Sequence, residues 1–217
     1  MARAFSDRER QMVEESLMDA GSEHIGRVGF SKTSVEDITR SAGVAKGTFY
    51  AFWSSKEEFF FACLGRAEQQ FQKEVVLPIL GSDSHPADAL GRLFDEVFAA
   101  MEGYPIISRA MDPDLIQHLS RRLPPEILEN HRTEDRLEFT EIVSSWNNDE
   151  FDPGISPDVF DGLFKGLMMM RLHRNIIGED VFPDVTRILS RILSEGLKAI
   201  SEKRQHPEYA SSPEHPS

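Results

Sequence analysis

The stretch Thr33–Lys56, TSVEDITRSAGVAKGTFYAFWSSK, decides the fold of the N-terminal region. Its first half predicts a short helix, because apolar residues recur at helical spacing and Thr33 and Glu36 have the spacing of a capping box. Gly43 supplies the positive φ of a sharp turn, and a second helix starts at about Lys46. Two short helices joined by such a turn are typical of a helix-turn-helix.

The second helix carries side chains that suit a DNA duplex at its N-terminal end. In a helix-turn-helix, this helix lies in the major groove with its first residues at the base edges. Lys46 can reach a phosphate or a guanine, Gly47 lets the backbone approach, and Thr48 and Tyr50 offer hydroxyl groups to phosphates. Phe49 is predicted to anchor the helix in the core. The shape alone also fits ordinary helix packing, which leaves two alternatives open.

The distribution of charge favours DNA. The 217-residue chain has a formal net charge of −13, which by itself argues against a polyanionic partner. Residues 27–56, however, hold five basic and two acidic side chains, whereas residues 57–217 hold 16 basic and 29 acidic ones. Because charges beyond a Debye length of about 8 Å are largely screened, a duplex responds mainly to the local positive patch.

Residues 29–60 closely resemble the N-terminal domain of the tetracycline-repressor (TetR-type) family of bacterial transcriptional regulators. The matching positions are Gly29, Thr33, Val35, Asp37, Ile38, Ala42, Gly43, Val44, Lys46, Gly47, Thr48, Phe49, Tyr50, Trp53, Ser55, Lys56, Glu57 and Glu58. The resemblance implies a sequence-specific transcriptional regulator, most often a ligand-responsive repressor. It assigns phosphate contacts to Thr33 or Ser34, Thr48, Tyr50 and Lys56. It assigns base-edge contacts to Ala45, Lys46 and Gly47.

Three positions depart from the family pattern. Ala45 stands where the family usually has a Ser or Thr that caps the recognition helix, and a lost cap typically costs about 1 kcal/mol. His24 occupies a position that is commonly apolar. Phe52 replaces a residue that is often polar and faces DNA, so a DNA contact by Phe52 is an open question.

The rest of the chain shows helical periodicity, which predicts an all-α fold of about nine helices. Residues 7–28 place Leu17, Gly21, His24 and Val28 on one face of the first helix. Further helices are predicted over 55–80, 87–103, 125–147, 156–177 and 183–203, with short pieces broken by prolines over 104–126.

The resemblance also implies a domain plan and a homodimer. A three-helix DNA-binding domain over 1–54 precedes an effector-binding and dimerisation domain over 55–205, and a polar tail over 206–217 is predicted to be disordered. Two recognition helices would lie roughly 34–36 Å apart on a palindromic operator. The last two long helices would form the dimer surface through Phe160, Gly162, Leu163, Gly166, Leu167, Met170, Ile188 and Ile192. The alternative is that helix 156–177 is simply central in its own monomer.

The middle helices are expected to enclose the effector pocket. A cluster of aromatic and methionine side chains suits a largely apolar, drug-sized molecule, although such residues are also common in ordinary cores. The candidates are Phe94, Phe98, Met101, Tyr104, Met111, Phe139, Val143, Trp146 and Met168.

The sequence gives little support to an enzyme. It has no HExxH motif, no phosphate-binding GxxxxGK[ST] loop and no Glu-x-x-His pair of the kind that metal-carboxylate bundles use, so no metal and no cofactor are predicted. Cys63 lies in an apolar helical context and reads as a buried thiol. With one cysteine, no secretory signal and no apolar run of membrane-spanning length, a cytoplasmic protein is expected.

Two other functions remain as alternatives. One is a regulatory scaffold of the same fold that binds a protein partner instead of DNA. The other is a small-molecule enzyme or carrier built on a helical bundle.

Overall fold

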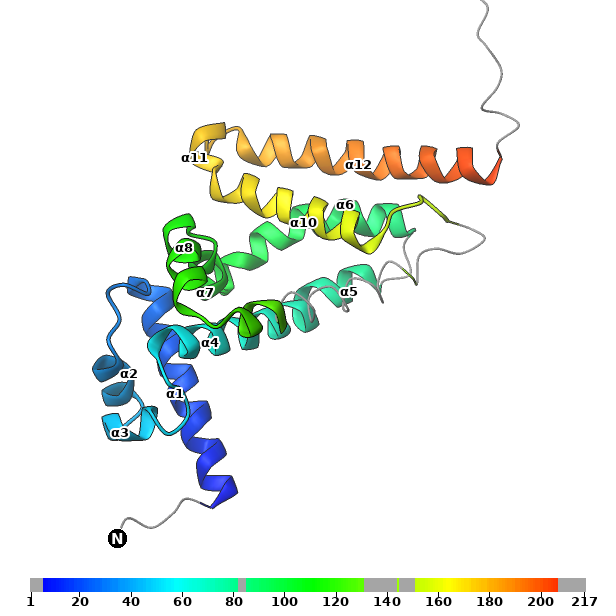
Figure 1. Cartoon of the computed structure of the whole chain (residues 1–217). Helices are drawn as coiled ribbons and strands as arrows, with labels where there is room; N and C mark the ends of the chain where they lie inside the picture. Colours follow the sequence, from blue (N-terminus) through cyan, green and yellow to red (C-terminus); the bar gives the residue numbers. More distant parts are fainter. Residues whose placement is uncertain (1–5, 82–84, 131–143, 145–150, 207–217) are drawn as a thin grey trace, which may run out of the picture. The chain divides into compact units, whose positions relative to one another are not determined.

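The computed structural model describes residues 6–81, 85–130, 144 and 151–206 (Figure 1). Over these residues all regular structure is helical, which confirms the predicted all-α class. The chain divides into two compact units, one formed by Met1–Gln72 with Met101–Glu129 and the other by Lys73–Ala100 with Asn130–Ser217. The functional boundary between residues 54 and 55 stays a prediction.

The first unit is built around two long helices that pack against each other. Its helices are α1 (Asp7–Val28), α2 (Val35–Ser41), α3 (Lys46–Phe49), α4 (Lys56–Phe71), the 3-10 helix η2 (Met101–Gly103), α7 (Pro105–Ala110) and α8 (Pro113–Arg122). Helix α1 begins at a capping box in which Ser6 and Glu9 satisfy each other's backbone N–H groups. Helix α1 contacts α2, α4 and α7, so the short helices of the unit are held by the long ones.

The predicted cap of α2 was wrong by one residue. Ser34, not Thr33, is the N-cap, and Asp37, not Glu36, completes the capping box. Thr33 is only 2% exposed, and its hydroxyl donates to the carbonyl oxygen of Gly29 at 2.9 Å. Thr33 therefore closes the turn that precedes the helix, and this leaves Glu36 on the surface without a capping role.

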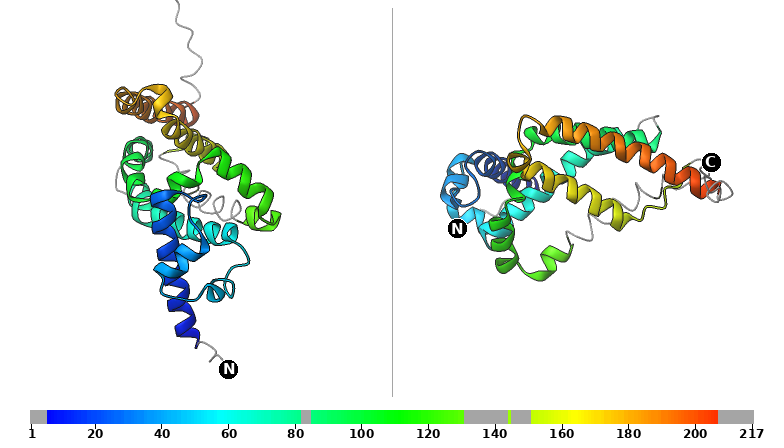
Figure 2. Two further views of the ribbon diagram at one scale, coloured as in Figure 1. Left: turned by 90° about the vertical axis from the view of Figure 1, so that its left-hand side faces the viewer. Right: turned by 90° about the horizontal axis from the view of Figure 1, so that it is seen from above.

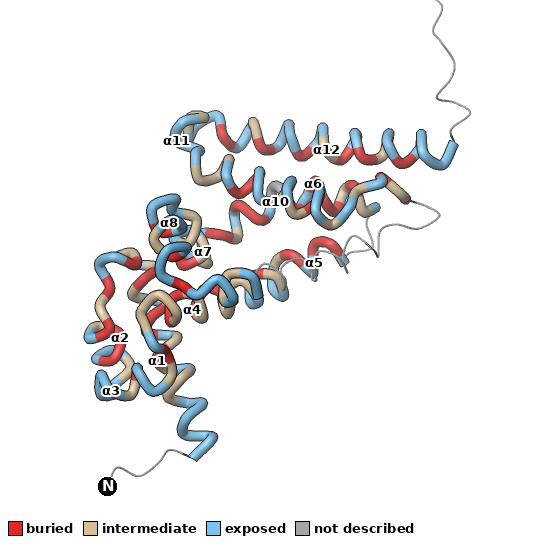
Figure 3. Tube along the Cα trace, viewed as in Figure 1, coloured by how far each residue is buried: buried red, intermediate tan, exposed pale blue. Residues whose placement is uncertain are grey.

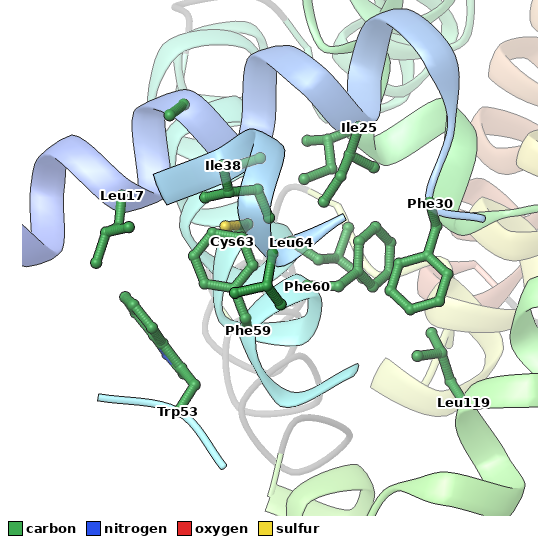
Figure 4. Packing of buried hydrophobic residues seen from close by; sticks show 14 of the residues in the cluster. Leu17, Ile25, Phe30, Ile38, Trp53, Phe59, Phe60, Cys63, Leu64 and Leu119 are labelled. Carbon is green, nitrogen blue, oxygen red and sulfur yellow. The ribbon is translucent and has the colours of Figure 1, made fainter. Parts of the chain in front are cut away.

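Aromatic rings fill the core of the first unit (Figure 4). The Phe59 ring centroid lies 5.0 Å from that of Phe49 and 4.7 Å from that of Trp53, and Phe30 meets Phe60 at 5.3 Å. These contacts join α3 and α4 to the loops beside them, so the position of α3 depends on this cluster.

The face that α1 buries is rotated from the predicted one. Leu17, Ala20, Gly21 and Ile25 are buried, whereas Val28 is 38% exposed. Leu17 and Gly21 were therefore correctly placed, but the stripe continues through Ile25 because α4 crosses α1 over that side.

We predict that Cys63 resists modification in the folded protein. It lies in the aromatic core, and burial raises the pKa of its thiol to about 12. The reactive thiolate is therefore scarce at pH 8. Iodoacetamide at pH 8 should leave the native protein unmodified by mass spectrometry and should label the protein fully in concentrated urea. Rapid labelling without denaturant would contradict the prediction.

The second unit contains α5 (Leu77–Leu80), α6 (Pro86–Ala100), α10 (Pro157–Leu172), α11 (Arg174–Ile177) and α12 (Phe182–Gln205). The predicted helix over 55–80 is interrupted by a π-helical turn, η1 (Gln72–Val76), between α4 and α5. The predicted helix over 156–177 is divided at His173 into α10 and α11. Most of the helix predicted over 125–147 falls on residues 131–143 and 145–147, which lie outside the described residues.

Helix α12 buries an unusually polar face. It packs along α6 (Figure 2), and the Ser190 hydroxyl donates to the Gly91 carbonyl at 2.7 Å while the Ser194 hydroxyl donates to Asp88 at 2.8 Å. Lys198 adds an ion pair with Asp88 at 2.7 Å. The buried residues of α12 recur along one side of the helix (Figure 3) and include Thr186, Ser190, Ser194 and Ser201. Since the side chains buried on this side are largely small and polar, many of the large apolar side chains of α12 lie on its other sides.

Candidate nucleic-acid interface

The connection between α2 and α3 has the geometry of a helix-turn-helix. Helix α2 ends at Ser41 with Ala42 as its C-cap, and Gly43 follows with φ of 70°, a conformation that glycine adopts without strain. The Val44 N–H then donates to the Thr39 carbonyl at 2.9 Å, which holds the turn against α2. Helix α3 starts at Lys46, so the predicted turn and start are confirmed.

Helix α3 is short and is fixed by one side chain. Phe49 is fully buried and contacts Phe59, Trp53 and Tyr50 through its ring. Phe49 points inward, whereas Lys46 and Gly47 at the start of the helix are exposed on the surface. Tyr50, directly after the helix, is 51% exposed. This surface can offer an ammonium group, a phenolic hydroxyl and bare backbone to a ligand.

Four further predicted contacts differ in how accessible they are. Ala45 is exposed and Thr48 is half-buried, and both are next to Lys46, Gly47 or Tyr50 in the chain. Ser34 is half-buried, and its hydroxyl is engaged with the Asp37 carboxylate at 2.6 Å. Thr33 is the least accessible, since its side chain is buried and bonded within its own turn.

Lys56 has an internal role that the sequence does not reveal. Its ammonium nitrogen donates to the carbonyl oxygens of Phe30 and Thr33, both at 3.0 Å, and lies 4.1 Å from the centre of the Phe30 ring. Burial lowers the pKa of Lys56. The side chain therefore ties the start of α4 to the segment between α1 and α2, and its predicted phosphate contact would have to compete with these bonds.

Lys46 also has a partner that helical spacing cannot show. Its ammonium group forms an ion pair and hydrogen bond with the carboxylate of Glu36 on α2. Each side chain is 51% exposed. The hydrogen bond between the two side chains raises the pKa of Lys46 and lowers the pKa of Glu36. The two groups lie ten residues apart and meet only because the turn folds α3 against α2.

We predict that Ala45→Ser stabilises the first unit. Ala45 is the N-cap of α3 and its backbone is extended, with φ of −71° and ψ of 147°, but it makes no side-chain cap bond. A serine hydroxyl in this conformation can accept a backbone N–H bond, which is worth about 0.5–1 kcal/mol. Urea unfolding followed by circular dichroism should show this gain, with Ala45→Val as a control that cannot cap. Equal stability of Ala45→Ser and wild type would contradict the prediction.

The predicted effector residues fall in both units. Met101, Tyr104 and Met111 belong to the first, whereas Phe98 and Met168 are buried in the second, where Phe98 meets Phe182 at 5.5 Å. Phe139, Val143 and Trp146, and the side chain of Phe94, lie outside what the structure describes. The effector pocket therefore stays a prediction.

The first unit also contains a cavity of about 650 Å³ that the sequence does not indicate. Basic and acidic side chains both line it, among them Lys32, Arg109 and Asp114. On the same wall, His118 Nε2 lies 2.8 Å from Glu57 Oε1. This mixture of charges of both signs gives no preference for one ligand class.

The predicted dimer residues separate into buried and exposed groups. Phe160 and Leu167 are each 2% exposed and belong to the core of their own unit, so the structure does not support them as surface contacts. Gly162, Leu163 and Gly166 on α10 and Ile188 and Ile192 on α12 are exposed, and Met170 is half-buried. The sequence missed four further exposed apolar side chains on these helices, Val159, Met169, Leu189 and Ile200.

Within the described ranges, no group of three or more His, Cys, Asp or Glu side chains could hold a metal ion. In the same part of the chain, no helix has both the length and the apolarity to cross a membrane.

Comparison with known proteins agrees with this geometry. The family model for bacterial regulatory proteins of the tetR family matches residues 17–63, which include α2, the turn and α3. The chain is 35% identical over 71 residues to the HTH-type transcriptional regulator YwcC of Bacillus subtilis, covering 33% of this chain and 31% of YwcC. It is 28% identical over 94 residues to the HTH-type transcriptional repressor DhaR of Mycobacterium sp. strain GP1, covering 43% of this chain and 48% of DhaR. The matched part thus spans less than half the length of these relatives.

Solved structures resemble the chain over most of its length. A TetR family transcription regulator from Marinobacter aquaeolei superposes with a TM-score of 0.61 at 15% identity, covering 88% of this chain and 98% of the other. The fatty acid degradation regulator FadR from Bacillus halodurans gives a TM-score of 0.60 at 13% identity, covering 88% of this chain and 96% of the other. At these identities the likeness shows the fold. Residues 17–63, which contain the helix-turn-helix, therefore match the tetR family of bacterial regulatory proteins, and the likeness to the solved structures is one of fold.

Proposed function

We propose that the chain is a sequence-specific, ligand-responsive repressor that binds a palindromic DNA operator as a homodimer. The observation that carries the proposal is the surface of α3, where the buried Phe49 holds Lys46, Gly47 and Tyr50 outward. Groups of this kind at the start of a recognition helix contact phosphates and base edges in the major groove. The tetR-family match over residues 17–63 covers the same surface.

The DNA-binding part is tested by retardation of the protein's own promoter region. Lys46→Ala removes one cation, and Tyr50→Phe removes one hydroxyl while keeping the ring that packs edge-on against Phe49 at 5.3 Å. Each variant should weaken binding about three- to tenfold at low salt. Lys203→Ala, which changes the charge equally on α12, serves as the control.

The same experiment separates DNA from a protein partner. Failure of the wild type to retard any DNA at low salt would contradict the proposal and favour a scaffold that binds a protein. Equal weakening by Lys203→Ala would mean that net charge, rather than the α3 surface, governs binding.

The exposed faces of α10 and α12 support the homodimer. Ile188 and Ile192 are 57% and 62% exposed, one turn apart on the side of α12 away from the buried serines. Leu163 and Met169 are exposed on α10, which turns back through α11 toward α12 (Figure 1). A helix that buries serines and exposes isoleucines is typical of a surface covered by a partner. A second copy is the partner that a palindromic operator requires.

The effector is proposed to be a small, largely apolar molecule bound in the C-terminal part of the chain. Phe98 and Met168 are the predicted wall residues that lie buried in the second unit. An effector changes DNA affinity only if it binds the DNA-competent and the DNA-free conformations with different affinity. Native mass spectrometry of the purified protein would reveal a retained ligand, and adding that ligand should weaken operator retardation.

A further inference from the structure

We propose that Glu36 is an electrostatic brake on DNA binding: it holds the Lys46 ammonium group in the free protein and lowers the affinity of the α3 surface for any duplex. The inference rests on the proposed function, since it assigns a regulatory residue to the same DNA-binding surface.

Glu36 and Lys46 meet at the N-terminal ends of the two short helices. Lys46 is the first residue of α3 and Glu36 lies in the first turn of α2, and their side chains are joined by an ion pair. Both are half exposed to solvent, so the pair lies on the surface that a duplex would meet. Lys46 therefore has to give up its ion pair with Glu36 before its whole charge can act on a phosphate.

Glu36 is not the acid that completes the capping box of α2. The neighbouring Asp37 does that work, because its carboxylate accepts from the Ser34 backbone N–H at 3.1 Å and from the Ser34 hydroxyl at 2.6 Å. Asp37 Oδ1 also lies 3.5 Å from Arg40 Nη1. The Glu36 carboxylate pairs with Lys46, on the recognition helix, and is also stabilised by its own backbone N–H. Removing its charge therefore leaves the capping box of α2 intact.

A polyanion would experience both members of the pair. A duplex that approaches Lys46 brings its phosphates within a Debye length of Glu36, so it meets a carboxylate as well as an ammonium group. The pair behaves as a nearly neutral unit, whereas a lone Lys46 would neutralise a phosphate and release a counterion. Removing the Glu36 charge should therefore strengthen binding and make it more sensitive to salt.

The experiment compares Glu36→Gln with wild type on two fluorescent duplexes, one of random sequence and one from the protein's own promoter region. Glutamine keeps the length and the helix preference of the side chain but removes its charge. On the random duplex at 50 mM salt, Glu36→Gln should bind about three- to fivefold tighter for each protomer in contact with the DNA. Its slope of log K against log salt should be steeper by about 0.9 per protomer. By 200 mM salt the difference should be nearly gone.

Two further variants show whether the effect passes through Lys46. In a Lys46→Gln background, Glu36→Gln should give a clearly smaller gain, because it then relieves only the repulsion between the Glu36 carboxylate and the phosphates and releases no cation. Glu202→Gln, an exposed acid on α12, changes the net charge equally and should leave both affinity and slope unchanged. Thermal unfolding of each variant confirms that the comparison is made between folded proteins.

The outcomes separate the brake from the proposed function. Equal binding by Glu36→Gln and wild type overturns the brake and leaves the function standing. Weaker binding by Glu36→Gln also overturns the brake, because Glu36 would then position Lys46 for DNA. If neither protein binds either duplex at 50 mM salt, the proposed function fails and the brake fails with it.

Discussion

Replacing Gly21 with alanine is expected to destabilise the first unit by about 1–3 kcal/mol, although alanine is the better helix former. A β-carbon at Gly21 would lie 2.3 Å from Cε1 and Cζ of Phe59. The Phe59 ring is fully buried and is held by Phe49 and Trp53. The ring therefore cannot move aside without shifting the cluster that anchors α3.

A matched glycine elsewhere in the unit provides the control. Gly65 lies within α4, and a β-carbon there would have no neighbouring atom within 4 Å. Gly65→Ala should therefore stabilise the protein by about 0.5–1 kcal/mol through helix propensity alone. Urea unfolding monitored by circular dichroism measures both changes in the free energy of unfolding.

A second substitution tests the physical cause. Phe59→Leu removes the ring atoms that meet the new methyl group, so Gly21→Ala should cost clearly less in the Phe59→Leu background than in wild type. A coupling of this sign is expected for residues in direct contact. If Gly21→Ala stabilises the protein as Gly65→Ala does, then α1 and α4 can separate at little cost and the Phe59 ring is not a rigid obstacle.

The helix-turn-helix could be predicted because its decisive residues are local. Gly43 is needed for one positive φ, and Phe49 has to point inward if its polar neighbours are to face outward. Both requirements depend on a few adjacent residues, and both are met in the structure. The all-α class follows in the same way from periodicity along single helices.

The features that sequence missed depend on how segments meet. Thr33 and Ser34 are each followed by an acid three residues later, so spacing alone cannot tell which hydroxyl caps α2. The choice is made by the bond from Thr33 to Gly29, which uses one hydroxyl in the preceding turn. The Lys46–Glu36 pair and the bonds of Lys56 likewise join residues ten or more positions apart.

The residues predicted for the dimer surface could not be sorted by burial from the sequence, for a related reason. Apolar residues on α10 and α12 are candidates for both a core and an interface, and composition does not separate these roles. Packing separates them, because Phe160 and Leu167 fill the second unit while Ile188 and Ile192 stay exposed. The serines of α12 could have indicated this. They form the side that packs on α6, so the isoleucines face away from α6.

Ile192→Glu is therefore expected to convert the proposed homodimer into monomers and to abolish retardation of the proposed operator. At 62% exposure the side chain lies on the surface of a single chain, so the carboxylate stays solvated there. In a dimer that covers this face, each protomer would bury one uncompensated charge, which costs about 3–5 kcal/mol in comparable settings. Dimerisation should weaken by at least about 100-fold, and a monomer reads only one half-site.

Light scattering coupled to size exclusion measures the change directly, with circular dichroism to show that the helices persist. Ile116→Glu is the matched control, because Ile116 is 49% exposed on α8 of the first unit and is not part of the α10 and α12 surface. This control should remain dimeric and should retard the operator as wild type does. If Ile192→Glu also remains a dimer, the isoleucine face of α12 is not the contact between protomers, and the spacing of the two recognition helices must be set by another surface.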